Sequence, residues 1–151
     1  MSSIDNYISN LNDFYRDGTS NHEEHNSNPD YFNQLLKKIT EDPDKWKNKN
    51  ALDFGCGKGR NVVNLHNLTN WNLVDGVDIS LENINFCKSN YQDLTSSFFK
   101  NNGSDLKDLE GNFYDFIMST IVFQHIPSRE VRVCLKKEIY RLLNGIWKKR
   151  K

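Results

Sequence analysis

The sequence predicts an α/β fold in which a mostly parallel sheet lies between two layers of helices. Short apolar runs, which suit buried strands, alternate along the chain with longer segments that are apolar at helical spacing. A glycine-rich turn directly follows the run that begins at Ala51, and the next run ends on an acid, Asp78. In doubly wound sheets, turns and acids at such positions form a ligand site at the carboxyl ends of the strands.

The N-terminal part of the chain is expected to form a helical lid. Residues 1–28 are polar and mixed, with apolar residues at helical spacing. His22 and His25 lie there in a polar stretch without a third ligand, so no metal site is expected. Residues 29–151 are expected to form the ligand-binding domain, because a chain of 151 residues can bury one substantial core.

Four strands and four helices are predicted in this domain. Pro29 suits the first turn of the first helix, and the second helix runs from the glycine turn to about Thr69. Ser80 caps the third helix, and Pro127 starts the fourth, which is amphipathic. The strands are expected at residues 51–54, 71–78, 97–100 and 113–119, the last of which is the most apolar.

Gly55, Gly57 and Gly59 alternate with other residues in the turn after the first strand. Glycines there let bare backbone and unpaired helix N–H groups approach a ligand without steric cost. A dinucleotide fingerprint needs a small third residue where this chain has Arg60, which disfavours a nicotinamide cofactor. No G-K-[ST] sequence follows at the spacing of a P-loop, so that alternative fails too.

The acid at the end of the second strand predicts an adenosine-containing ligand. Asp78 lies about as far beyond the glycines as a ribose-binding carboxylate does in a doubly wound sheet. A carboxylate at a strand end can accept hydrogen bonds from both ribose hydroxyls. Asp75 is the rival on the same strand, but the apolar neighbours of Asp78 favour Asp78 as the strand end.

An acid followed by G-x-G-x-G resembles the first motif of the class I S-adenosylmethionine-dependent methyltransferases, and the resemblance extends from about residue 30 to residue 143. It implies a Rossmann-like three-layer αβα fold with strand order 3-2-1-4. It also implies that S-adenosyl-L-methionine binds here and that S-adenosyl-L-homocysteine is the product. The implied cofactor-binding residues are Asp53, Gly55, Cys56, Gly57, Gly59, Asp78, Ile79, Ser104, Asp105, Leu106 and Ser119.

Within that set, the family places an acid and an apolar neighbour after the third strand, against the adenine. Asp105 is therefore the implied adenine contact, with Leu106 or a backbone N–H assisting. His125, just beyond the fourth strand, is the candidate general base or orienting group, because histidine titrates near neutral pH. A histidine packed beside the ligand or in the helix interface is the alternative.

The resemblance also raises the question of what covers the fourth strand. A complete class I domain has seven strands, whereas this sequence ends shortly after Gly145, so the last strands are expected to be missing. An apolar strand would then lie at an open edge, which favours pairing with another chain. We expect either a homodimer through that edge or its coverage by a terminal segment.

The composition limits the classes of substrate and the cellular location that we expect for the protein. Lys plus Arg equal Asp plus Glu at 20 each, so the formal net charge is zero and a nucleic-acid partner is not expected. No apolar run reaches the roughly twenty residues needed to cross a bilayer, and three unpaired cysteines suit the cytoplasm. We expect a methyltransferase acting on a small molecule; the alternatives are a non-catalytic or truncated cofactor-binding module and, third, an NAD-binding oxidoreductase.

Overall fold

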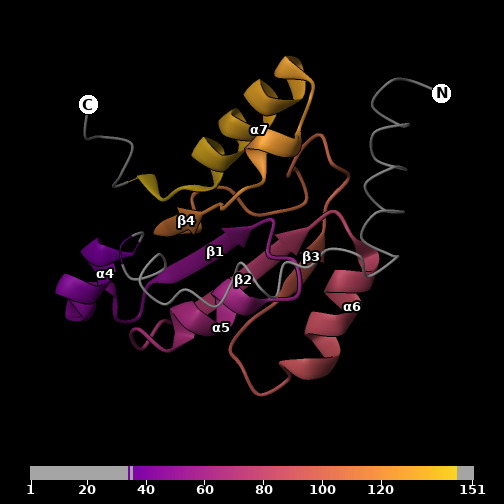
Figure 1. Ribbon diagram of the computed structural model, residues 1–151. Helices are drawn as coiled ribbons and strands as arrows, with labels where there is room; N and C mark the ends of the chain where they lie inside the picture. The colour runs from indigo at the N-terminus through magenta and orange to yellow at the C-terminus, as the bar shows by residue number, and fades with distance from the viewer. Residues whose placement is uncertain (1–33, 35, 146–151) are drawn as a thin grey trace.

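Four parallel strands form one sheet at the centre of the fold (Figure 1). They are β1 (Asn50–Phe54), β2 (Leu73–Asp78), β3 (Phe98–Lys100) and β4 (Phe116–Met118), in the order β3-β2-β1-β4. The computed structural model describes residue 34 and residues 36–145, so the lid predicted at residues 1–28 lies outside the described residues. Strand order and direction confirm the predicted Rossmann-like fold.

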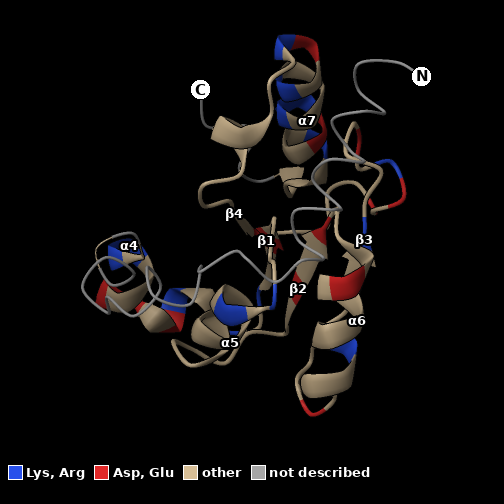
Figure 2. Ribbon diagram, turned by 45° about the vertical axis from the view of Figure 1, so that its right-hand side comes forward, with Lys and Arg blue, Asp and Glu red and all other residues tan. Residues whose placement is uncertain are grey.

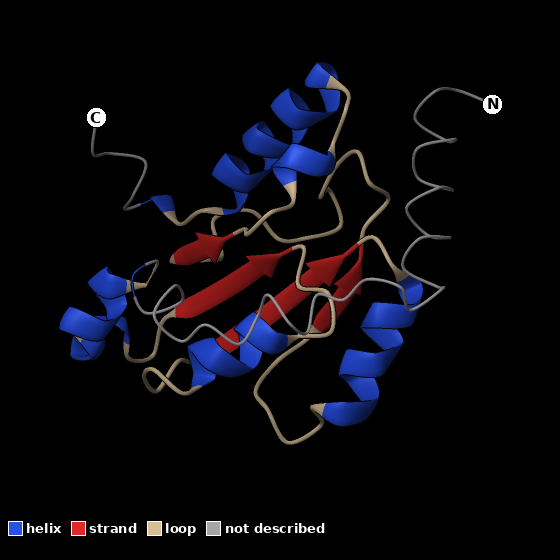
Figure 3. Ribbon diagram, viewed as in Figure 1, coloured by secondary structure: helices blue, strands red, loops and turns tan. Residues whose placement is uncertain are grey.

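Helices cover both faces of this sheet, which gives the three predicted layers (Figure 3). They are α4 (Lys37–Glu41), α5 (Arg60–His66), α6 (Leu81–Asn90) and α7 (Arg129–Leu142), with 3-10 turns η1 (Pro43–Trp46) and η2 (Phe123–His125). The first three helices lie on one face and α7 lies on the other. None of the helices in the described ranges is long and apolar enough to span a membrane.

The alternation of side chains along the strands creates two apolar clusters, one on each face of the sheet. Ala51 packs with α5 and α6, whereas its neighbour Leu52 packs with α7. Acidic residues are also present on β1 and β2 between these layers, while basic and acidic residues alternate along α7 (Figure 2). Those interior acids are Asp53, Asp75 and Asp78, all of them buried.

Some predicted boundaries were wrong, and β2 begins at Leu73 and not at residue 71. The helix after the glycine turn ends at His66 and not near Thr69, because the Leu68 N–H bonds to the Leu65 carbonyl, a tightening that ends an α-helix. The strand predicted at residues 113–119 is shorter, since β4 comprises only Phe116–Met118.

The first part of that predicted strand pairs with the chain that follows α7. Phe113 and Tyr114 donate their N–H groups to the Leu142 carbonyl, and Asn144 donates to the Tyr114 carbonyl at 2.7 Å. A parallel bridge joins Tyr114 and Leu143. The segment after α7 therefore covers part of the edge that the sequence left open, while no strand within residues 36–145 pairs with the outer side of β4 itself. The homodimer through this edge stays a prediction.

Asp75 has a structural role on the α7 face of the sheet. Its Oδ2 accepts from the Tyr114 hydroxyl at 2.8 Å and its Oδ1 from the Ser97 N–H at 2.7 Å. Burial raises the pKa of this carboxyl, and the two hydrogen bonds oppose that shift. The buried pair ties β2 to the segment that precedes β4.

Tyr114→Phe should therefore lower the free energy of unfolding by about 1–3 kcal/mol, because the buried Asp75 carboxylate loses a hydrogen-bond donor. Urea denaturation of the two proteins at pH 7 measures this difference. Equal midpoints and slopes would show that water or another group replaces the hydroxyl without cost.

Candidate cofactor-binding site

The loop of residues 55–59 folds over the carboxyl end of β2. Gly55 and Cys56 both donate their N–H groups to the Val77 carbonyl, at 2.7 and 3.1 Å, and Gly59 donates to the Cys56 carbonyl at 2.9 Å. From α6 and its end, the Cys87 thiol and the Tyr91 hydroxyl approach the carbonyls of the middle of the loop. Contacts with β2, with α6 and with Tyr91 therefore hold this loop in place.

Gly57 faces open space at the top of this loop. Its φ of +52° lies in the left-handed region that favours glycine, and a Cβ added there would meet no atom of the described residues within 4 Å, apart from its chain neighbours. At Gly55 the same addition would lie 2.0 Å from a methyl carbon of Val122. Gly55 therefore lets the protein pack against the loop, whereas Gly57 leaves bare backbone beside a space that a ligand can fill.

Asp78 lies directly beside Gly57 at the end of β2. Its Oδ2 accepts from the Gly57 N–H at 2.9 Å, and its Oδ1 accepts from the Ser80 N–H at 2.8 Å. Asn83 donates a longer bond of 3.4 Å to the same Oδ1. Burial raises the pKa of Asp78, and these hydrogen bonds oppose the shift. The glycine turn and the strand-end acid that the sequence singled out are thus brought together.

Asp53 forms the floor of the site on β1. It is 0% exposed, and neither of its carboxylate oxygens has a hydrogen-bond partner among the described residues. Burial and the neighbouring Asp78 carboxylate raise its pKa to about 7, while the charge of Arg60 opposes the shift. Arg60 itself has Nε and Nη1 buried without hydrogen bonds to any part of the chain that the structure describes. Buried polar groups are normally paired, so this cluster has hydrogen-bonding capacity for a further group.

Further buried polar atoms lie at the start of α5 and just beyond the ends of β3 and β4. Asn61, at the start of α5, donates to Thr120 Oγ1 at 3.2 Å, while its own Oδ1 is buried without a partner within the described ranges. Two further buried atoms have no partner in residues 36–145: Ser119 Oγ, one residue beyond β4, and Asn101 Oδ1, one residue beyond β3. Polar atoms without partners therefore gather around the carboxyl edge of the sheet.

The predicted adenine contacts lie in the loop after β3. Asn102 Oδ1 accepts from the N–H groups of Ser104 and Asp105, both at 2.9 Å, which folds the loop into a tight turn. A hydrogen bond from Asn102 lowers the pKa of Asp105, so its half-buried carboxyl is ionised at neutral pH. Leu106, which was expected to assist Asp105, has its side chain buried in the α7-side cluster, and its N–H donates to Glu138.

The other predicted residues are placed as follows. Cys56 is buried, and a Cβ added at Gly76 would lie 2.8 Å from its Sγ, so this thiol points toward β2 and leaves its backbone as the part beside the site. A hydrogen bond with Cys87, together with burial, raises the pKa of the Cys56 thiol. Ile79 is half-buried directly after β2, and His125 is exposed on η2, beyond β4.

Some candidate site residues were missed by sequence reasoning. From the sequence, Arg60 was considered only as an obstacle to dinucleotide binding. A cation in the first turn of a helix opposes the helix dipole, so its presence there indicates a role other than stabilising the helix. Asn61 carried no signal, because asparagine is abundant throughout this chain. Glu138 and Arg141 on α7 have the spacing of an ordinary surface ion pair, and only the fold reveals which loop they reach.

A parallel α/β sheet in the order 3-2-1-4, with a glycine turn and strand-end acids at its carboxyl edge, defines a protein of the Rossmann-like class. Within that class, residues 51–145 match the methyltransferase domain family, and the chain belongs to this family of class I S-adenosylmethionine-dependent methyltransferases. The matched segment contains every predicted cofactor residue. No protein with a curated description matches the chain.

Solved structures of methyltransferases share the fold. One from Aquifex aeolicus is 21% identical with a TM-score of 0.55, over 74% of this chain and 66% of that one. One from Mesorhizobium loti is 16% identical with a TM-score of 0.55, over 72% and 50%. PKMT2 from Rickettsia typhi, in complex with AdoHcy, is 26% identical with a TM-score of 0.54, over 64% and 19%. The chain spans 57% and 49% of two further matches.

Proposed function

We propose that the chain binds S-adenosyl-L-methionine at the carboxyl edge of β1 and β2 and transfers its methyl group to a small-molecule acceptor. The observation that carries this proposal is the contact of Gly57 with Asp78 at 2.9 Å beneath open space. An adenosine ligand in that space would have bare backbone on one side and a carboxylate on the other. Family membership and the AdoHcy in the Rickettsia typhi protein support the choice of ligand.

The residues present fit the parts of this cofactor. Asp78 would accept hydrogen bonds from the ribose hydroxyls, and Asp105 would accept one from the adenine amino group. The buried oxygens of Asp53, Asn61 and Ser119 are acceptors that suit the ammonium group of the amino-acid tail. Arg60 is a cation that suits its carboxylate.

The bound cofactor supplies a methyl group already activated by a sulfonium charge. The protein then has to align an acceptor atom with that methyl and exclude water. His125 is proposed as the group that removes a proton from the acceptor or orients it, since it is exposed on η2 just beyond β4. The balance of 20 basic and 20 acidic residues supports a small acceptor over a nucleic acid.

Isothermal titration calorimetry with S-adenosylmethionine, S-adenosylhomocysteine and NAD tests the cofactor. We expect both sulfur nucleosides to bind and NAD not to bind. Binding of NAD alone would overturn the proposal. A methyl-release assay against a panel of metabolites then tests turnover: affinity for the cofactor without turnover on any acceptor would favour a binding module over an enzyme.

Asp78→Ala should weaken S-adenosylhomocysteine binding by about 1–3 kcal/mol, the usual effect of removing a charged hydrogen-bond partner. Asp75→Ala is the matched control, because it removes a buried acid from the same strand on the opposite face. Both substitutions are expected to lower the melting temperature. Only Asp78→Ala should change the dissociation constant measured well below that temperature, and equal losses in the two variants would contradict the ribose assignment.

A further inference from the structure

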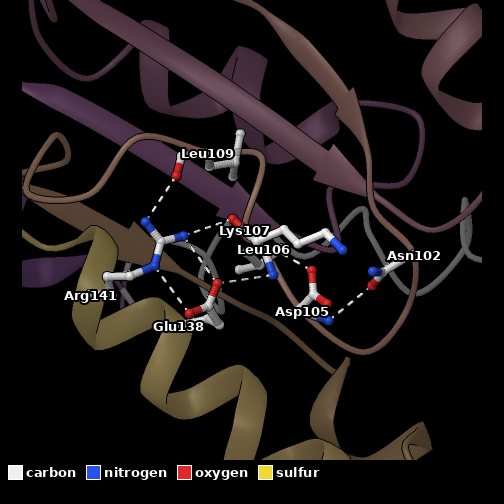
Figure 4. Close-up of polar contacts among 7 residues, drawn as sticks. All are labelled: Asn102, Asp105, Leu106, Lys107, Leu109, Glu138 and Arg141. Atoms are coloured by element: carbon white, nitrogen blue, oxygen red, sulfur yellow. Dashed lines mark hydrogen bonds and ion pairs between the residues drawn. The ribbon is translucent and has the colours of Figure 1, made fainter.

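A pair of charged side chains on α7 holds the loop between β3 and β4 (Figure 4). Arg141 donates from Nη2 to the Leu106 carbonyl at 2.9 Å and from Nη1 to the Leu109 carbonyl at 3.0 Å. Glu138 Oε2 accepts the Leu106 N–H at 3.3 Å. Both polar backbone groups of Leu106, the residue after Asp105, are thus bonded to one helix.

Glu138 and Arg141 also hold each other in place. Arg141 Nε donates to Glu138 Oε1 and Arg141 Nη2 donates to Glu138 Oε2, both at 3.0 Å. Each charge favours the other, so the pKa of Arg141 is raised and that of Glu138 is lowered. The planar guanidinium therefore reaches the two carbonyls from a fixed position, and a lysine has no comparable fork of donors.

Asp105 is fastened from both sides by these contacts. Before it, Asn102 Oδ1 accepts the N–H groups of Ser104 and Asp105. After it, Leu106 is bonded to Glu138 and Arg141. The loop cannot shift at Asp105 without breaking one of these two sets of hydrogen bonds.

We propose that Arg141, held by Glu138, is a positioning residue that sets Asp105 against the nucleobase of the cofactor and thereby fixes the preference of the site for adenine. This inference rests on the proposed function. Adenine offers an exocyclic amino group to an ionised carboxylate, whereas hypoxanthine has a carbonyl oxygen at the same place. A correctly placed Asp105 therefore favours adenine, and a displaced one discriminates less.

The test compares the affinities for S-adenosylhomocysteine and S-inosylhomocysteine, measured by calorimetry. The natural protein should prefer the adenine compound by about tenfold or more, because a site built to accept a donor rejects the analogue that lacks it. Arg141→Lys keeps the positive charge but removes the fork, and it should reduce this ratio to less than about threefold. Glu138→Gln should lower the ratio less than Arg141→Lys, since the amide oxygen can still accept the Leu106 N–H.

Arg132→Lys is the matched control on the same helix. Arg132 Nη1 also donates to two backbone carbonyls, those of Ile126 and Pro127, but in a different loop. We expect Arg132→Lys to reduce the melting temperature as Arg141→Lys does while leaving the ratio of the two affinities intact. An equal fall of the ratio in both arginine variants would overturn the inference, because it would indicate general loosening of α7.

The outcomes separate this inference from the proposed function. If the natural protein binds neither compound, both the proposed function and this inference are overturned. Binding of both compounds with equal affinity would leave the cofactor site standing and overturn the role of Asp105 and Arg141. If Arg141→Lys does not fold, Glu138→Gln carries the test, and a ratio unchanged in that variant would overturn the inference alone.

Discussion

Gly57→Val should weaken cofactor binding about a hundredfold or more while leaving the fold almost intact. The added side chain would enter the space above the loop, where no atom of residues 36–145 other than its chain neighbours lies within 4 Å of the new Cβ. Because that space is the proposed ligand position, we expect a loss of about 3 kcal/mol or more, which is about a hundredfold in Kd. The free energy of unfolding should fall by only about 1–2 kcal/mol, the cost of a left-handed backbone for a residue with a Cβ.

Gly55→Ala provides the contrast. Its new methyl group would lie 2.0 Å from a Val122 methyl carbon, so a β-branched side chain with little rotamer freedom has to move. We expect a larger loss of thermal stability than for Gly57→Val despite the smaller substituent. Scanning calorimetry and titration of S-adenosylhomocysteine measure the two effects separately. Nearly natural affinity in Gly57→Val would exclude the space above Gly57 as the ligand position.

The sequence predicted the sheet well because its strands carry strong local signals. Gly55 follows β1 and β2 ends at Asp78, and parallel strands as buried as these two leave little choice of partner or direction. The position of Asp78 followed for the same reason, since a strand end fixes what lies at the carboxyl edge of the sheet.

What the sequence could not predict depends on contacts between distant segments. The boundary of β4 moved because Phe113 and Tyr114 bond to the Leu142 carbonyl, nearly thirty residues away along the chain. The burial of Leu106 depends on how α7 packs across the sheet, and no local pattern specifies that packing. The hydrogen bonds from Arg141 to Leu106 and Leu109 could not be predicted either, because a basic residue on a helix surface gives no indication of which carbonyls it contacts.

The buried carboxyl of Asp53 should make the stability of the protein depend on pH. Its pKa is raised from 3.8 to about 7 in the folded protein, chiefly by burial. The folded state therefore keeps a proton that the unfolded state releases, and the stability present below about pH 4 is lost as the pH rises through 7. A shift of this size corresponds to roughly 4 kcal/mol of unfolding free energy. Asp78 and Asp75, whose pKa values are also raised, contribute with the same sign.

The Asp53→Asn variant measures how much of this pH dependence of stability is due to Asp53. The amide stays neutral, so the variant should match the natural protein near pH 4 and exceed its stability at pH 8 by up to about 4 kcal/mol. Urea denaturation at one-unit pH intervals measures the difference, and the carboxyl carbon resonance of Asp53 reports its titration directly. A stability difference that stays constant from pH 4 to pH 8 would contradict the prediction. It would mean that a partner such as Arg60 or entering water keeps Asp53 ionised in the folded protein, so that the floor of the site is charged before any ligand arrives.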